Sequence, residues 1–277
     1  RSGSTQMARH LDQDPNLIAP SLGMTMFPYV WFWKLVPRTI GRCISQERVQ
    51  QKVLEMLPPE ALKRHEFDPF QTDTFDPAFL TAHLNSNAIQ LGPTIAAVEF
   101  CFAEFAPHNQ SLMEEDYLQF MDRVGRKTLL HHGCTDGTKR LFLKGHFLLV
   151  APSLAQQYPD CSMLAVARDP LQRLKSAIHF MRVSPTDPFL GPTPWNWLAR
   201  MFESTESRYC QVEQKWFSTQ HESVTKCVVH FDDYVQDLSG VMTTIYKECL
   251  GMESVPEDMP TEHAPKERPN YVVNRSL

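Results

Sequence analysis

Short apolar runs alternate along the chain with longer amphipathic stretches. The run Ser162–Ala167 (SMLAVA) is continuously apolar after its first residue and is followed by Arg-Asp-Pro, which is typical of a buried strand. The segment that begins at Pro170 repeats apolar residues at helical spacing, with proline in its first turn. The whole pattern predicts strands over 16–19, 140–143, 162–167 and 226–231, and helices over 4–14, 46–57, 114–125, 146–157, 170–182, 205–220 and 238–250. Gly251 follows the last helix and is predicted to cap its C-terminus.

The order of these elements predicts the fold class. Strands that alternate with helices imply right-handed βαβ crossovers and therefore a parallel sheet. The 277 residues, 42% of them hydrophobic, suffice for one large α/β domain or two small ones, and we expect a single domain over 1–277. Within it, the proline-rich segment around 183–204 is interpreted as a lid or excursion. Ligands of such folds bind beyond the carboxyl ends of the strands.

Composition narrows the function classes. The net charge of −5 argues against a dedicated nucleic-acid binder, so an anionic ligand needs a local cluster of positive groups. The seven cysteines are scattered without a CxxC pair, which predicts reduced thiols rather than a disulfide framework or a metal site. The most apolar stretch, 24–36, is shorter than a bilayer span and is interrupted by Pro28 and Lys34. No signal peptide is visible.

Two segments have the chemistry of phosphate binding. The first is Arg1-Ser2-Gly3-Ser4-Thr5-Gln6, which leads into a predicted helix. Glycine permits close backbone approach, and successive N–H groups at a helix N-terminus attract anions. The alternative is a flexible chain end, and the spacing differs from that of nucleotide-hydrolysing P-loops.

The second segment joins the predicted strand 162–167 to its helix. Arg168 ends the strand, and Ser176 follows eight residues later on the helix, so a guanidinium and a hydroxyl can bind one phosphate together. The alternative is that Arg168 caps a neighbouring helix or pairs with Asp169.

Together, RSGST (1–5) and RDPLQRLKS (168–176) resemble the two nucleotide-binding motifs of the sulfotransferases that use 3′-phosphoadenosine-5′-phosphosulfate (PAPS). The likeness is strongest to the branch with a PRSGTT-like 5′-phosphosulfate loop, and it extends in outline to 140–160 and 228–251. It implies a P-loop-type three-layer α/β fold whose first strand is expected before Arg1. It also implies no metal and a nucleotide product, adenosine 3′,5′-bisphosphate.

The resemblance implies roles for individual residues. Arg1, Ser2, Gly3, Ser4, Thr5 and Gln6 are expected to hold the 5′-phosphosulfate, Arg168 and Ser176 the 3′-phosphate, and Lys266 and Arg268 to close over the nucleotide. In-line sulfuryl transfer to a hydroxyl or amine then needs Arg1 and Lys144 to stabilise charge. It also needs a base, for which His146 has a suitable pKa range. The family's K-S-P-x-H turn is shortened here to Lys144-Gly145-His146.

Several alternatives stay open at this point. Carboxylates of the acidic loop (Glu66, Asp68 and Asp73) are backup bases, although such a loop is expected to be solvent-exposed. The aromatic residues within 24–36 have three possible roles: they line an acceptor cleft, they touch a membrane, or they pack in the core. Core packing is the simplest interpretation. The acceptor is a small molecule, a lipid or a glycan, and no nucleic acid is expected. An ATP-dependent small-metabolite kinase and a non-catalytic interaction module are the competing functions. The cysteines favour the cytoplasm, and the Golgi lumen is the alternative if a leader is missing.

Overall fold

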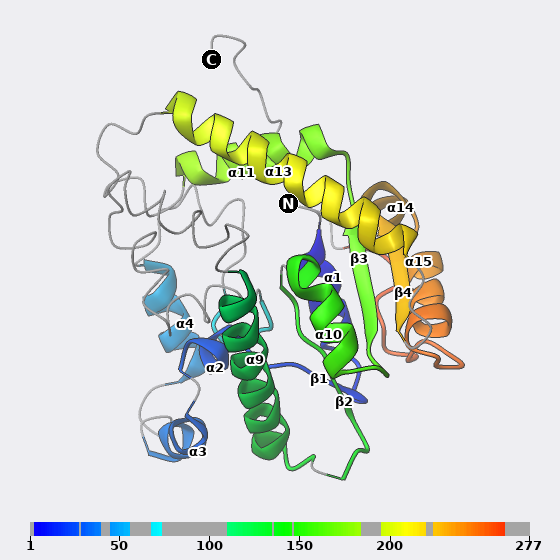
Figure 1. Ribbon diagram of the computed structural model, residues 1–277. Helices are drawn as coiled ribbons and strands as arrows, with labels where there is room; N and C mark the ends of the chain where they lie inside the picture. Colours follow the sequence, from blue (N-terminus) through cyan, green and yellow to red (C-terminus); the bar gives the residue numbers. More distant parts are fainter. Residues whose placement is uncertain are drawn as a thin grey trace. The chain divides into compact units, whose positions relative to one another are not determined.

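The computed structural model describes residues 3–27, 29–39, 45–55, 68–73, 110–134, 136–145, 147–183, 195–219 and 224–263. The chain divides into two compact units, and each is described by itself (Figure 1). The first unit comprises Arg1–His10, Phe147–His179 and Pro194–Leu277. The second comprises Leu11–His146 and Phe180–Thr193.

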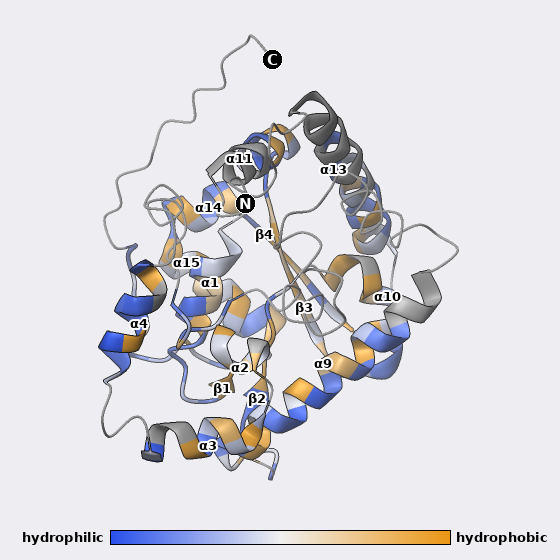
Figure 2. Ribbon diagram, turned by 90° about the vertical axis from the view of Figure 1, so that its left-hand side faces the viewer, coloured by the Kyte–Doolittle hydropathy of each residue, from blue (hydrophilic) through white to orange (hydrophobic). Residues whose placement is uncertain are grey.

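A parallel strand pair forms the centre of the first unit. β3 (Ser162–Ala167) pairs with β4 (Thr225–His230) along its full length, from Ser162 opposite Thr225 to Ala167 opposite His230. β3 is apolar after Ser162, and the middle of β4, from Cys227 to Val229, is apolar between polar ends (Figure 2). The predicted strand 162–167 and the parallel pairing are confirmed, and β4 begins and ends one residue before its predicted limits.

Helices pack on both sides of this pair. In both views α10 and α15 lie on opposite sides of β3 and β4 (Figures 1 and 2). Ala151 and Ala155 of α10 form a buried cluster with Trp216 and Val224. The helical elements that lie wholly or mostly in this unit are α1 (Ser4–Leu11), η2 (Phe147–Val150), α10 (Ala151–Gln157), α11 (Pro170–Val183), α13 (Trp195–Ser218), α14 (Phe231–Gln236), α15 (Leu238–Thr244) and the π-helical turn η3 (Ile245–Cys249). The last residue of α1 and residues 180–183 of α11 are assigned to the second unit.

The second unit contains another parallel pair, in which β1 (Leu17–Ile18) lies beside β2 (Arg140–Leu141). Its helices are α2 (Leu22–Met26), α3 (Val30–Thr39), α4 (Gln46–Glu55) and α9 (Gln110–His132). Gly125 lets α9 approach β2 closely, because a Cβ at this position would lie 2.6 Å from Leu141 Cδ2. Among the residues that the structure describes, no helix has both the length and the apolar character needed to cross a membrane.

Several elements begin or end at other residues than predicted. The predicted helix 146–157 is a 3₁₀ turn followed by α10, since Pro152 is accepted in a first turn but not in a helix interior. The predicted helix 238–250 changes to a π turn at Ile245 before Gly251, whose φ of 62° suits a C-terminal cap. α9 and α13 are longer than predicted, and α2, α3 and α14 were not predicted.

The prediction that all cysteines are reduced is wrong for one pair. Cys227 on β4 and Cys249 at the end of η3 form a disulfide, with their Cα atoms 5.8 Å apart. The two residues are 22 positions apart, and packing of η3 against β4 brings them together. Cys134, Cys161 and Cys210 are free thiols, and Cys43 and Cys101 lie outside the described residues.

Candidate functional site

The predicted 5′ loop is a tight turn into α1, in the first unit. Gly3 has a φ of 77°, and its carbonyl accepts the N–H of Met7 at 3.1 Å. A Cβ at Gly3 would lie 2.7 Å from Cε2 and 2.8 Å from Cδ2 of Phe231, so the backbone passes directly against that ring. Ser4, Thr5 and Gln6 form the first helical turn, which has no acidic residue. This end of α1 is therefore suited to an anion.

The predicted 3′-phosphate arginine lies at the same aromatic ring. Arg168 directly follows β3, and its guanidinium carbon lies 4.3 Å from the centroid of the Phe231 ring. Phe231 directly follows β4, the neighbour of β3, so both residues leave the sheet at its carboxyl edge. The structure thus brings both the loop at Gly3 and the Arg168 guanidinium into contact with the Phe231 ring. Stacking uses the face of the guanidinium, whose N–H groups point outward in its plane.

The turn after Arg168 is fixed by the next residue. The Asp169 carboxylate accepts the backbone N–H of Gln172 at 2.8 Å, so Asp169 caps α11, with Pro170 as the first residue of that helix. Ser176 lies two turns into α11, and its exposure is only 3%. Its placement on the helix is as predicted, whereas its role toward a phosphate stays a prediction.

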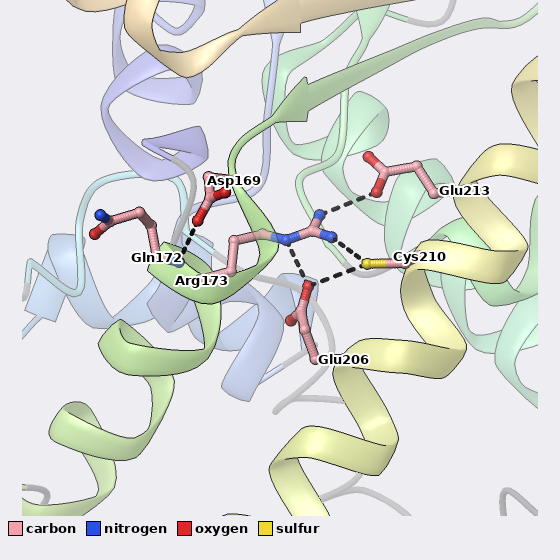
Figure 3. A network of polar contacts seen from close by, with 6 residues as sticks. All are labelled: Asp169, Gln172, Arg173, Glu206, Cys210 and Glu213. Atoms are coloured by element: carbon pink, nitrogen blue, oxygen red, sulfur yellow. Dashed lines mark hydrogen bonds and ion pairs between the residues drawn. The ribbon is translucent and has the colours of Figure 1, made fainter. Parts of the chain in front are cut away.

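A charged network ties α11 to α13 beside this turn (Figure 3). Nε of Arg173 pairs with Glu206 at 2.6 Å, Nη1 with Glu213 at 3.1 Å, and Nη2 contacts the Cys210 sulfur at 3.3 Å. Burial lowers the pKa of Arg173, but the two carboxylates outweigh it and raise the pKa above its usual value. The network holds the helix that carries Ser176.

The back of the loop is supported by a chain of ring and amide contacts. Gln6 Nε2 lies 3.2 Å from His263 Nδ1, and His263 Nε2 lies 2.6 Å from the Tyr234 carbonyl. A carbonyl only accepts, so Nε2 of His263 carries the proton and Nδ1 accepts from the Gln6 amide. The Tyr234 hydroxyl in turn bonds His10 Nδ1 at 3.0 Å, and burial raises the pKa of Tyr234 well above its usual value.

The predicted catalytic lysine lies in the second unit and is ion-paired. Lys144 Nζ is 2.6 Å from Asp73 Oδ1, and the side chains are only 11% and 7% exposed. The expectation that the acidic loop is solvent-exposed is therefore wrong for Asp73. As the partner of a buried lysine, this carboxylate neutralises a charge that burial would otherwise penalise.

Other predicted site residues fall outside the described part of the chain. They are Arg1, Ser2, His146, Lys266 and Arg268, and Glu66 among the backup bases. Within the described ranges, no group of three or more His, Cys, Asp or Glu residues is placed to hold a metal ion. Asp232 and Asp233 lie in the first turn of α14, where negative charge stabilises a helix.

Sequence reasoning missed Phe231, Tyr234 and His263. Phe231 ends the apolar run VVHF and was included in the strand, although its place at the carboxyl edge of the sheet was a usable signal. The contact between Gln6 and His263 spans 257 positions, and no local pattern indicates it.

Comparisons with known proteins support the fold. No protein-family model matches the chain, and no curated protein matches it in sequence. Among solved structures, the chain is similar to the crystal structure of the sulfotransferase STF1 from Mycobacterium tuberculosis, with a TM-score of 0.61 and 17% sequence identity. The match covers 91% of this chain and 65% of that one, so the chain spans less than two thirds of the neighbour's length. The chain therefore has the α/β fold of a sulfotransferase, with parallel sheets and flanking helices.

Proposed function

We propose that this chain is a sulfotransferase that moves a sulfuryl group from PAPS to a hydroxyl or amine acceptor. Its first unit is proposed to bind the nucleotide at the carboxyl edge of β3 and β4. The observation that carries the proposal is the meeting of Gly3 and Arg168 at the ring of Phe231. It is supported by the fold shared with a solved sulfotransferase.

The residues of this edge fit an anionic nucleotide. Gly3 has no Cβ, so its backbone can approach a neighbouring group closely, and the first turn of α1 presents its positive end there without an acidic residue. Arg168 adds a full positive charge beside the same ring. Two positive features at one edge are what a nucleotide with two phosphate groups requires. In this proposal Ser176 binds the 3′-phosphate together with Arg168. Ser2 belongs to the 5′-phosphosulfate site, and Lys266 and Arg268 close over the nucleotide.

PAPS supplies the sulfuryl group, and its adenosine bisphosphate leaves with added negative charge on the oxygen of the broken S–O bond. The work of the protein is then positioning and charge stabilisation. The N–H groups of 3–6 and the Arg1 guanidinium are proposed to hold the 5′-phosphate. Gln6 is fixed by His263, which limits the motion of the first helical turn.

The acceptor side is assigned by residue type. His146 is proposed as the base that takes the acceptor proton, because a neutral imidazole is available near neutral pH. Lys144 is proposed to stabilise sulfuryl oxygens, and Asp73 to orient it, since the two are joined at 2.6 Å. Asp73 itself is a weaker candidate for the base, because its oxygen already accepts from an ammonium group.

A thermal-shift experiment separates this proposal from a kinase. Adenosine 3′,5′-bisphosphate should raise the Tm without magnesium, whereas a kinase should respond to ATP with Mg²⁺. Transfer of ³⁵S from labelled PAPS to a panel of alcohols, sterols and glycans then tests the reaction. At a hundredfold excess over Kd, stabilisation of about 2.7 kcal/mol is expected.

Two arginine variants provide the matched comparison. Arg168→Ala should abolish most of the nucleotide-induced shift. Arg126→Ala, which removes a guanidinium that is 79% exposed and pairs with Asp122 on α9, should leave the shift intact. A shift with Mg²⁺-ATP alone, or an equal shift in both variants, would contradict the proposal.

A further inference from the structure

An unusual aromatic surface lies on α3 and the turn before it, in the second unit. Four rings within six residues are exposed: Phe27 at 56%, Tyr29 at 55%, Trp31 at 63% and Phe32 at 36%. Leu35 adds a side chain that is 51% exposed. We call these five residues the aromatic patch. The expectation that the aromatic residues of 24–36 pack in the core holds only for Trp33, which is 7% exposed.

Trp33 explains why Trp31 and Leu35 face outward. Its indole Nε1 donates to the Phe27 carbonyl at 2.6 Å, and its ring meets His131 of α9 edge-to-face at 5.6 Å. Trp31 and Leu35 are one helical turn apart, and Trp33 lies between them in sequence, on the opposite side of the helix. Docking Trp33 on α9 therefore directs Trp31 and Leu35 away from the unit.

The exposed rings are ordered against one another. Phe27 stacks on Phe32 with centroids 5.8 Å apart, Phe32 meets Trp31 edge-to-face at 5.9 Å, and Tyr29 lies 6.3 Å from Trp31. The patch is therefore a preorganised surface. Binding to it costs little side-chain entropy, because the rings already restrict one another.

The charged residues on the same helix indicate what kind of partner binds the aromatic patch. α3 carries Lys34 and Arg38, both exposed, and no acidic residue. Arg38 is seven positions after Trp31 and shares its face of the helix. Exposed Trp, Tyr and Phe beside basic residues are typical of segments that lie in the interface of an anionic bilayer. With ten residues, α3 is about 15 Å long and lies along such an interface rather than across it.

From these observations we propose that the aromatic patch, with Lys34 and Arg38, docks the protein on a membrane surface that contains anionic phospholipids. The rings enter the boundary between headgroups and acyl chains, and the two cations contact headgroup phosphates. The inference does not depend on the proposed sulfuryl transfer, since it rests on α3 and the turn before it, and none of their residues has a role in that transfer.

Vesicle co-sedimentation tests the proposal with the whole chain. Binding to vesicles of phosphatidylcholine with phosphatidylserine should exceed binding to phosphatidylcholine alone, and it should weaken with added salt. Trp31→Ser with Leu35→Ser should lower the partition coefficient at least ~10-fold, because both side chains lose contact with the acyl region. Lys34→Gln with Arg38→Gln should lower it ~10-fold or more on anionic vesicles and little on neutral ones.

Leu171→Ser is the matched control, since Leu171 is 64% exposed but lies on α11 in the other unit. It should bind vesicles as the unaltered chain does. Thermal melts of all variants should coincide, because the altered side chains are exposed. Equal binding to neutral and anionic vesicles, no vesicle binding, or undiminished binding by the Trp31/Leu35 variant would overturn the proposal. So would a dimer in solution that this variant converts to a monomer, because the patch would then be covered by a second copy.

Discussion

Gly3 offers a direct test of the site, because one added methyl group should disturb it. Gly3→Ala places a Cβ 2.7 Å from the Phe231 ring and forces a non-glycine residue into a φ of 77°. The ring cannot simply withdraw, since Arg168 is stacked on it at 4.3 Å. We therefore expect both the stability of the first unit and its affinity for nucleotide to fall.

The loss of stability expected for Gly3→Ala has two parts. The positive φ costs an alanine about 1–2 kcal/mol. The collision adds about 1–3 kcal/mol, as overpacking does elsewhere. Gly137 separates the two parts, because its φ is also 77° but a Cβ there meets nothing within 4 Å. Gly137→Ala should show the backbone cost alone, and Gly3→Ala should be destabilised by about 1–3 kcal/mol more, worth about 2–10 °C in Tm.

Urea denaturation of four chains measures the collision as a coupling energy. Gly3→Ala is compared with the unaltered chain, and Gly3→Ala with Phe231→Ala is compared with Phe231→Ala alone. Removing the ring should relieve the collision. The loss of unfolding free energy caused by Gly3→Ala should therefore be smaller by at least about 1 kcal/mol in the Phe231→Ala chain than in the unaltered chain. If Gly3→Ala costs the same in both backgrounds, or no more than Gly137→Ala, the close approach of loop and ring is refuted.

Three further predictions concern stability. Arg173→Leu leaves Glu206 and Glu213 without their half-buried cation and should cost about 2–4 kcal/mol in urea denaturation; a cost no greater than that of the exposed Arg126→Ala would contradict the network's role. Cys227→Ser with Cys249→Ser should lower the free energy of unfolding by about 3 kcal/mol, from loop closure over 22 positions; an unchanged urea midpoint after reduction would argue against the bond. Burial lowers the pKa of His131 and His132, so the unfolded chain binds more protons and stability should fall as pH drops through about 6.5. Replacing both histidines with Gln should flatten that slope between about pH 5.5 and 7.5, and an equally steep profile would exclude them as its source.

Local patterns predicted the elements that local rules determine. The strand 162–167 and the start of α11 follow from an uninterrupted apolar run, a capping Asp169 and Pro170, all within nine residues. Parallel pairing of β3 with β4 follows from the alternation of strands and helices. α3 was not predicted because the apolar residues of VWFWKLVPRT lie on both sides of Lys34 without a helical spacing, and the segment contains Pro37.

Contacts between segments that are distant along the chain could not be predicted from local sequence patterns. The pairs Lys144–Asp73 and Gln6–His263 lie 71 and 257 positions apart, and neither member has a neighbour that indicates the other. The disulfide was missed for the same reason, since cysteines 22 positions apart form no motif. The convergence of Gly3 and Arg168 was expected only from the family resemblance, and the ring of Phe231 that joins them was not expected at all.

Isothermal titration calorimetry with adenosine 3′,5′-bisphosphate, in buffer with EDTA, tests the proposed nucleotide site most directly. We predict one site per chain that binds without magnesium, an affinity at least ~10-fold weaker in Arg168→Ala, and an unchanged affinity in Arg126→Ala. No heat of binding for the unaltered chain, or equal affinity in both variants, would contradict the account.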